Sequence, residues 1–380
     1  MKVNIIGNGI TKFGELWEED LRGLAFMAGF SAIKDANLEP KDIDALYIAN
    51  MNSSSFSGQQ HLGSLIASDL NLNCPGLRVE GVCASGSLAI NCAFNAIKSQ
   101  LYKTVLVIGV EKMTDVETAI ATMALASASD EEWEGFYGVT FPCLYAMMAR
   151  EHFRQYGTNR EDLAKISVKN HLNAILNPNA HFHRAISTND VLRAPLVSSP
   201  LGLLDCSPIS DGAAAIILSS KFKGKVELVT SEIATDKIAL HDREELTSIK
   251  ATRIAGTSAY KTAGIKPKDI DIAEVHDCFS IAELIAYEDL GFVTTKQTKK
   301  YISDGYFSRE GELPINTSGG LKGCGHPVGA TGVKQANEIV LQLLGKAGTR
   351  QLNRPLRYGL THNVGGSGGT SVINIFKKNK

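Results

Sequence analysis

The chain has 380 residues, 44% of them hydrophobic, so it can bury a large core and exceeds the usual size of one domain. Its 39 basic and 40 acidic residues nearly cancel and form no long basic run, which argues against nucleic acid as a partner. The N-terminus has the pattern of neither a signal peptide nor a membrane span, and no segment is apolar for long enough to cross a bilayer. Seven cysteines without a CxxC pair are typical of a reducing compartment, so we expect a cytoplasmic protein.

Strand-like and helix-like segments alternate from the N-terminus onward. The run MKVNIIGNGI begins as a strand, and a helical stretch then ends at Asn37. Residues 38–50, LEPKDIDALYIAN, continue into an apolar strand. Residues 103–113 predict another buried strand of this first half.

One short motif occurs twice in the same context. Residues 38–50 and residues 265–277 share PKDID in register, and each copy follows a helical stretch and precedes an apolar strand. Residues 369–376 predict a closing strand for the second copy. The sequence therefore predicts a duplicated α/β fold in layers, with largely parallel central sheets.

Residues 116–200 interrupt this pattern with helical segments joined by polar connections. We expect an inserted loop region that lies over the first half, and it serves equally well as a wall of a substrate site or as a structural cover. A strand pattern returns at residues 210–220. The predicted domains are a first half at 1–115 and 201–250, the insertion at 116–200, and a second half at 251–380.

Cys83 lies in the small-residue segment EGVCASGSLAI. The pattern predicts an extended entry, a sharp turn over residues 81–85, and then an amphipathic helix. At the N-terminal end of that helix, free N–H groups and the helix dipole would favour a thiolate. The alternative is a buried structural cysteine in a tight turn, which is equally consistent with this segment alone.

His326 lies in a loop of similar composition, GGLKGCGHPVGATG, before another amphipathic helix. The glycines permit unusual backbone geometry and the close approach of a ligand. A neutral imidazole near Cys83 could take the thiol proton or donate to a developing oxyanion. We therefore interpret His326 as functional rather than as a structural histidine.

In combination, these motifs resemble those of the thiolases over essentially the whole chain. VCASGS and GGLKGCGHPVGATG resemble the nucleophile and histidine motifs, and VEKMTD resembles the segment after a core strand of that family. HDCF at 276–279 resembles the sterol-carrier-protein type, while ITKFGELWEEDL and VKNHLNAILNPNAHF are similar to archaeal acetyl-CoA acetyltransferases. The resemblance implies a duplicated five-layered αβαβα fold with an inserted loop domain, and a homodimer or tetramer.

The resemblance also implies a role for individual residues. Cys83 matches the nucleophile that accepts the acyl group, and His326 matches the histidine that activates it. His276 stands where the commoner thiolases carry an asparagine, which implies a role in a first oxyanion hole. Gly365 aligns with a glycine whose N–H joins that of Cys83 in a second oxyanion hole, and Ser207 matches a serine near the pantetheine arm.

A second catalytic cysteine of most thiolases is missing here. Its CxG motif reads Asn363, Val364 and Gly365, yet condensation still requires a base to remove an α-proton. In the sterol-carrier-protein type the HDCF cysteine fills this role, so Cys278 is our candidate, with simple packing under the site as the alternative. Cys324 lies near His326 but matches no cysteine of the family, so we interpret it as incidental.

The implied activity is that of an acetyl-CoA C-acetyltransferase, which joins two acetyl-CoA molecules into acetoacetyl-CoA or reverses this by thiolysis. We expect no cofactor, since coenzyme A is a substrate or product of the reaction, and we expect no metal. The resemblance implies possible partners in 3-hydroxy-3-methylglutaryl-CoA synthase and an OB-fold, zinc-ribbon scaffold protein of the mevalonate pathway. A degradative 3-ketoacyl-CoA or sterol-chain thiolase and a non-catalytic lipid-binding or scaffold protein remain the alternatives.

Overall fold

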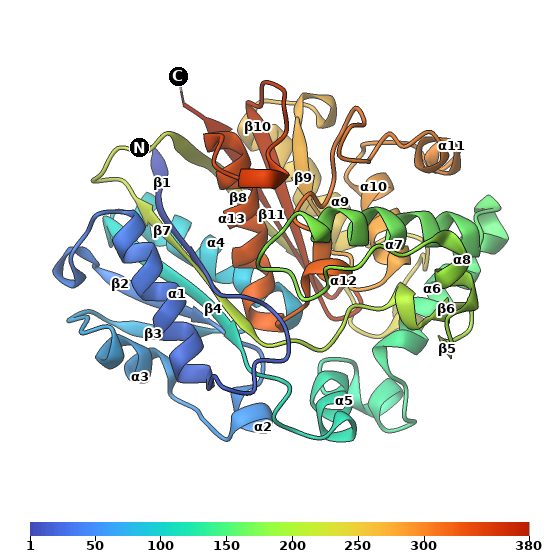
Figure 1. Cartoon of the computed structure of the whole chain (residues 1–380), viewed down its shortest axis with the longest axis horizontal. Coiled ribbons are helices and arrows are strands. Elements are labelled where there is room, and N and C mark those ends of the chain that lie inside the picture. Colours follow the sequence, from blue (N-terminus) through green and yellow to red (C-terminus); the bar gives the residue numbers. More distant parts are fainter. Residues whose placement is uncertain (380) are drawn as a thin grey trace.

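A computed structural model describes residues 1–379 (Figure 1). Within these residues nine strands form one mixed sheet, in the order β3-β2-β4-β7-β1-β8-β11-β10-β9. The strands are β1 (Val3–Ile10), β2 (Ala45–Ala49), β3 (Gly76–Val79), β4 (Thr104–Glu111), β7 (Gly212–Ser219), β8 (Val226–Thr235), β9 (Ile272–Glu274), β10 (Tyr358–Gly365) and β11 (Thr370–Lys378). A separate pair consists of β5 (Leu196–Ser198) and β6 (Leu201–Gly202).

Six helices cover the two halves of this sheet in layers. They are α1 (Leu21–Asp35), α3 (Leu62–Asp69), α4 (Ser85–Lys98), α9 (Lys250–Ala263), α10 (Ser280–Asp289) and α13 (Thr331–Leu344). The first two pack on the outer face of the first half, and α9 and α10 pack on the outer face of the second half. The helices α4 and α13 share a core with strands of both halves and so form the central layer. The structure thus confirms the predicted five-layered α/β arrangement.

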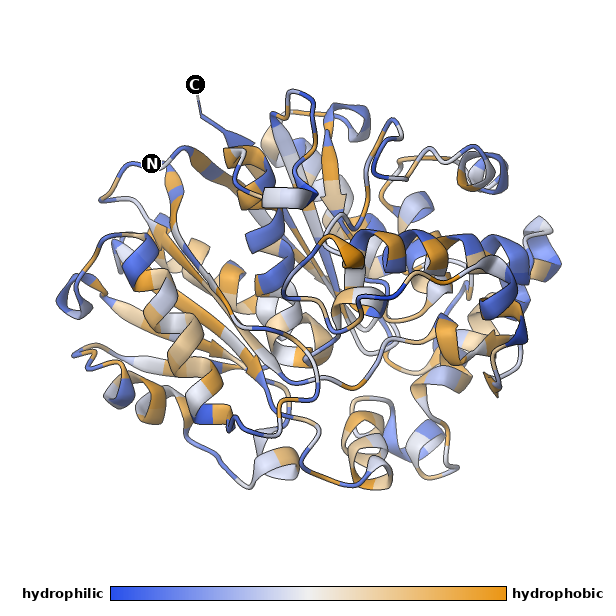
Figure 2. Ribbon diagram, in the orientation of Figure 1, coloured by the Kyte–Doolittle hydropathy of each residue, from blue (hydrophilic) through white to orange (hydrophobic). Residues whose placement is uncertain are grey.

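Apolar side chains explain why these layers form. Figure 2 shows hydrophobic residues concentrated along the central strands and on the inward faces of the helices. The strands β4, β7 and β10 are buried along their whole length, as expected when helices cover both faces of a sheet. No helix within residues 1–379 is both long and apolar enough to cross a membrane.

The direction of the strands differs from the sequence prediction. Among the pairings described for residues 1–379, β2 is parallel to β3 and β4, and β9 is parallel to β10. The other five pairings in the large sheet are antiparallel, so the expectation of largely parallel sheets was wrong. A short turn joins β10 to β11, and only antiparallel strands can be joined so tightly.

The repeated PKDID motif has the same structure in both halves. Each copy forms a single 3₁₀ turn, at Pro40–Asp42 and Pro267–Asp269, between a helix and a strand. The aspartate closes the turn by accepting the backbone N–H of Glu39 in one copy and of Lys266 in the other, at 3.1 and 2.7 Å. The strand order β2-β4-β7-β1 then matches β9-β10-β11-β8, which supports duplication.

The inserted region packs mainly on the second half. Its helices are α5 (Thr118–Ala126), α6 (Phe141–Tyr156), α7 (Arg160–Ile175) and α8 (Thr188–Arg193). Figure 1 shows α6 and α7 beside α10, and their apolar residues share one core with that helix. Contacts with the first half are fewer: α5 meets α2 (Ser53–Ser57), and Phe13 packs against Ala174 of α7 in a small cluster. The expected cover over the first half was therefore largely wrong.

The sheet divides before β8. This strand pairs with β11 along Val226–Thr235 but with β1 only along Val226–Leu228. We expected the first half to extend to residue 250. In the sheet, however, β8 pairs mainly with a strand of the second half. The helix α9 then covers β8 and β11.

Candidate active site

The turn that carries Cys83 has an unusual backbone conformation. Val82 adopts a φ of 54°, which is rare for a β-branched residue and is found mainly at functional sites. Ser85 holds the turn, because its hydroxyl accepts the Gly81 N–H at 2.9 Å and donates to the Val82 carbonyl at 2.6 Å. The helix α4 begins at Ser85, so the predicted turn and helix are confirmed.

The loop of His326 lies opposite this turn, between α12 (Gly320–Cys324) and α13. Two glycines let the N-terminal ends of α4 and α13 approach each other. A Cβ on Gly86 would lie 2.7 Å from the backbone nitrogen of Gly332, closer than real Cβ contacts allow. This close packing of two related helix ends brings Cys83 and His326 together.

The hydrogen bonds of His326 decide which ring nitrogen can accept a proton. Nδ1 lies 2.7 Å from the hydroxyl oxygen of Thr331. That hydroxyl donates its own proton to the Pro327 carbonyl at 3.0 Å, so it accepts from the imidazole. Nδ1 therefore carries the ring proton, and Nε2 keeps the lone pair that can accept a proton.

Cys83, His276 and His326 meet at one buried point. The two rings lie edge to face with centroids 5.3 Å apart, and one ligand atom from each of the three residues lies within 4.8 Å of the others. This set joins a nucleophile to two imidazoles. A thiolate and two imidazoles could also hold Zn²⁺, and the expectation that no metal takes part stays a prediction.

Cys278 lies in the same region, near the hydroxyl of Tyr145 and close enough to Cys83 for the charge of one thiolate to raise the pKa of the other thiol. The Tyr145 hydroxyl donates to the Gly366 carbonyl at 3.0 Å. Its ring stacks on Phe279, with centroids 4.6 Å apart. The tyrosine, from the inserted helix α6, thus packs against the HDCF motif and the loop after β10.

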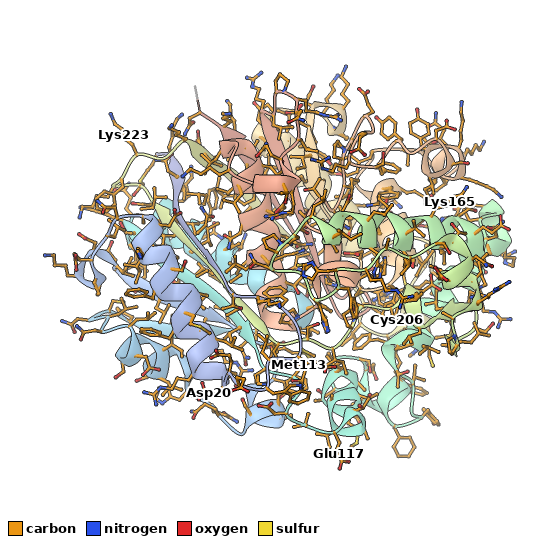
Figure 3. All side chains as sticks on the ribbon, in the orientation of Figure 1. Asp20, Met113, Glu117, Lys165, Cys206 and Lys223 are labelled. Atoms are coloured by element: carbon orange, nitrogen blue, oxygen red, sulfur yellow. The ribbon has the colours of Figure 1, made fainter. Side chains whose placement is uncertain are left out.

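Ser207 and Gly365 lie close to this cluster. The Ser207 N–H donates to the Cys278 carbonyl at 2.8 Å, and its neighbour Cys206, labelled in Figure 3, forms a β-bridge with the HDCF motif. Gly365 ends β10, and the next residue, Gly366, has its backbone N–H close enough to the Cys83 thiol to lower the pKa of that thiol. The roles of Ser207 and Gly365 in binding stay predictions.

Family models match both halves of the chain. Residues 3–221 match the thiolase N-terminal domain, and residues 233–378 match the thiolase C-terminal domain-like family. The chain belongs to the thiolase family. An acetyl-CoA acetyltransferase of Methanothermobacter thermautotrophicus is 49% identical over 99% of each sequence. Sterol carrier protein 2 of Bos taurus is 34% identical over 99% of this thiolase and 72% of its own length.

A solved structure also has the same fold as this thiolase. It is named Ltp2-ChsH2(DUF35) aldolase, and the superposition has a TM-score of 0.86. The match covers 100% of this thiolase and 98% of that chain, at 24% sequence identity. At this level of identity, the similarity concerns the fold alone.

Burial controls the protonation of the Cys83 thiol in this thiolase. It raises the pKa of the Cys83 thiol to about 12, and the carboxylate of Glu111 adds to this, while the Gly366 N–H acts in the opposite direction. The expected preference for a thiolate at the helix end was therefore wrong, because loss of solvation outweighs the helix terminus. Burial also lowers the pKa of His326 to about 3, so this imidazole is neutral and able to accept the thiol proton.

These two shifts predict a broad pH plateau for acyl transfer to Cys83. With a thiol pKa of about 12 and a His326 pKa of about 3, neither group titrates between pH 5.5 and about 8.5. We expect kcat/KM for acylation by acetyl-CoA, followed by rapid quench and mass spectrometry, to stay constant over this range. A fall in rate on acidification with a midpoint near 6.5, the ordinary histidine value, would contradict the prediction.

Glu111 connects the His326 loop to the first half of the thiolase. Its carboxylate accepts the backbone N–H groups of Met51, Asn52 and Gly329 at 2.8, 3.1 and 2.9 Å, and the Asn50 amide at 2.8 Å. All four neighbours are donors, so the position requires a side chain with two acceptor oxygens.

Glu111→Gln places an NH₂ group against two of these donors. We expect it to lower the free energy of unfolding by about 2–4 kcal/mol, because two buried N–H groups lose their acceptor. Urea denaturation followed by circular dichroism measures this change. Glu310→Gln, at an exposed glutamate, is the control and should change little. Equal stability of the two variants would contradict the assignment of Glu111 as the acceptor for these four donors.

Sequence reasoning did not identify several residues around the site. Glu111 lies within the VEKMTD motif, so a signal for it existed, namely a carboxylate at the end of a buried strand. Thr331 follows the glycine-rich loop, but only its hydrogen bond reveals its role. Tyr145 comes from the insertion, and nothing in the sequence places it beside Cys278.

Proposed function

We propose that this chain is an acetyl-CoA C-acetyltransferase, acting by Claisen condensation of two acetyl-CoA molecules or by the reverse thiolysis. The observation that carries the proposal is the buried cluster of Cys83, His276 and His326, with ligand atoms within 4.8 Å of one another. The acetyl-CoA acetyltransferase at 49% identity supports acetyl transfer over other thiolase activities.

In the first step the Cys83 sulfur attacks the thioester carbon of acetyl-CoA. His326 Nε2 accepts the thiol proton and passes it to the departing sulfur, so free coenzyme A and an acetyl-enzyme result. The N–H groups of Cys83 and Gly365 are proposed to hold the oxyanion of the tetrahedral intermediate. Because the resting thiol is protonated, this proton transfer accompanies the attack rather than preceding it.

In the second step Cys278 is proposed to remove an α-proton from a second acetyl-CoA. The enolate carbon then attacks the acetyl group, and Cys83 leaves as a thiolate that recovers a proton. Burial and the nearby Cys83 raise the Cys278 pKa well above its ordinary value, so the resting thiol holds its proton. In thiolysis this thiol can protonate the departing enolate directly. In condensation Cys278 must first give this proton to another base, for which neutral His326 is available, and the same proton then returns to the Cys83 thiolate that leaves.

Acyl chain length separates this proposal from a degradative or sterol-chain thiolase. Thiolysis of 3-ketoacyl-CoA substrates with acyl chains of increasing length should give the highest kcat/KM with acetoacetyl-CoA. A preference for long chains would refute the acetyl-specific proposal while leaving the thiolase chemistry in place. The sterol carrier protein 2 relative, at 34% identity, makes this comparison necessary.

We also propose that the chain assembles, as a homodimer or tetramer in the cytoplasm. The edge strand β3 leaves Leu77 52% exposed, and an uncovered edge of this kind is suited to pairing with another strand. Light scattering at micromolar concentration tests the state directly, and a monomer would refute it.

Condensation of two acetyl-CoA molecules is thermodynamically uphill. A partner enzyme that consumes acetoacetyl-CoA would therefore draw the reaction forward. We propose 3-hydroxy-3-methylglutaryl-CoA synthase and an OB-fold, zinc-ribbon scaffold as partners, within the mevalonate pathway. The solved structure named Ltp2-ChsH2(DUF35) aldolase, which has the same fold, is a precedent for the binding of a second protein by a chain of this fold. Purification of an isolated homo-oligomer from the native cell would count against the complex.

A further inference from the structure

By its resemblance to the family motif, Asn363 occupies the position of the second catalytic cysteine of most thiolases. Its side chain is fully buried in β10. Nδ2 lies 3.1 Å from Nδ1 of His276, and Oδ1 accepts the backbone N–H of Ser87 at 3.4 Å. The asparagine therefore lies between the α4 helix and one of the two imidazoles of the cluster.

The surroundings of Asn363 fix which way its amide points. The Ser87 N–H can only donate, so it must face the amide oxygen. The reversed amide would place two donors against each other and leave both unsatisfied. Glycine at position 332 leaves room for the amide oxygen, because a Cβ there would lie only 2.3 Å from Oδ1. The NH₂ group therefore points to His276 and donates to it.

This donated hydrogen bond determines the tautomer of His276. Because Nδ1 accepts, it carries no proton, and the proton of the neutral ring is on Nε2. Nε2 is buried and has no hydrogen-bond partner among residues 1–379. A buried N–H without a partner is costly, which is consistent with a donor kept for the substrate.

The two imidazoles of the cluster therefore have opposite tautomers. Thr331 accepts from Nδ1 of His326 and leaves its Nε2 as an acceptor, whereas Asn363 donates to Nδ1 of His276 and leaves its Nε2–H as a donor. Two acceptors would offer nothing to a developing oxyanion, and two donors would leave the Cys83 proton without a base. Proton acceptance and oxyanion binding each require one of these forms.

We propose that Asn363 is a positioning residue that fixes His276 as the N–H donor to the thioester oxygen of the substrate. This inference rests on the proposed acetyl transfer. It assigns Asn363, which replaces the usual cysteine, a function different from that of the cysteine. The base for the α-proton is then a separate group, which is consistent with Cys278 in that role.

The variant Asn363→Asp tests the inference with almost no change in shape. The carboxylate still accepts the Ser87 N–H, but it also demands a proton from His276 Nδ1, which turns Nε2 into an acceptor. We expect kcat for acetoacetyl-CoA thiolysis to fall by about 10²–10³-fold with little change in KM, the effect of losing one oxyanion donor. The matched control Asn374→Asp places the same charge in the adjacent strand β11, where Asn374 donates to Thr361, and should keep kcat.

Nitrogen NMR of histidine-labelled protein reads the tautomer without any assay of activity. We assign the His276 signals by their loss in His276→Asn, and we expect protonated Nε2 in the wild type and protonated Nδ1 in Asn363→Asp. Protonated Nδ1 in the wild type would overturn the inference, and this measurement stands even if the variant fails to fold. An unchanged kcat in folded Asn363→Asp would overturn it as well. A wild type without thiolase activity but with protonated Nε2 would instead refute the proposed function.

Discussion

Replacing Cys83 by alanine is expected to lower acetoacetyl-CoA thiolysis by at least about 10⁴-fold, the loss typical of a removed nucleophile. In the proposed mechanism the acetyl-enzyme depends on a bond to the Cys83 sulfur, and neither imidazole of the cluster can form a thioester. Mass spectrometry of the wild type after mixing with acetyl-CoA should show one acetyl group on the peptide containing Cys83. The variant should show none. Its stability should change little, because the substitution removes a single side-chain heavy atom.

Cys324 provides the matched control for this experiment. It too is buried, two residues before His326, but it packs in a separate cluster with Phe13, and its sulfur accepts the side-chain amide of Asn177 at 3.4 Å. Burial raises the pKa of its thiol to about 11. Cys324→Ala should therefore keep kcat, whereas acetylation of Cys324 would refute the assigned nucleophile. If Cys83→Ala left both activity and ligand affinity unchanged, a non-catalytic lipid-binding or scaffold role would be favoured.

Local sequence was a good guide wherever a short segment determines its own structure. The small residues around Cys83 predicted the turn and the following helix, and both are present. The PKDID repeat predicted two related halves, because proline begins each turn and its aspartate closes it. In these cases the decisive hydrogen bonds join residues only a few positions apart.

Features that depend on distant contacts could not be derived in this way. The insertion packs on the second half through bonds such as that between the side chains of Asn170 and Asp277, at 2.6 Å, and no local pattern reveals such a partner. The protonated state of Cys83 likewise follows from burial by residues of both halves, whereas the sequence shows only the helix end. The tautomers of the two histidines depend on Thr331 and Asn363, which become meaningful only once the rings have been placed.

Replacing Cys278 by alanine is expected to separate the two steps of the reaction. In the proposed mechanism acyl transfer to Cys83 needs only His326 and the oxyanion donors, so exchange of labelled coenzyme A into acetyl-CoA should continue at close to the wild-type rate. Condensation and thiolysis both require a proton to move at the α-carbon, and loss of this acid-base group should slow them by about 10²–10⁴-fold. In the proposed mechanism the second substrate brings its methyl group to this thiol, which lies near the Tyr145 hydroxyl.

Two further measurements distinguish catalysis by Cys278 from simple packing. Wild-type enzyme in D₂O should introduce deuterium at the α-carbon of acetyl-CoA, and Cys278→Ala should not. Cys278→Ser keeps the size of the side chain, but its hydroxyl is a far weaker acid than a thiol, so a catalytic role predicts that serine fails as alanine does. If serine restored full condensation, the thiol would be acting only as a packing group, and the α-proton would have to leave to another base of the site. Equal loss of exchange and condensation in both variants would show that Cys278 shapes the Cys83 pocket instead of handling the proton.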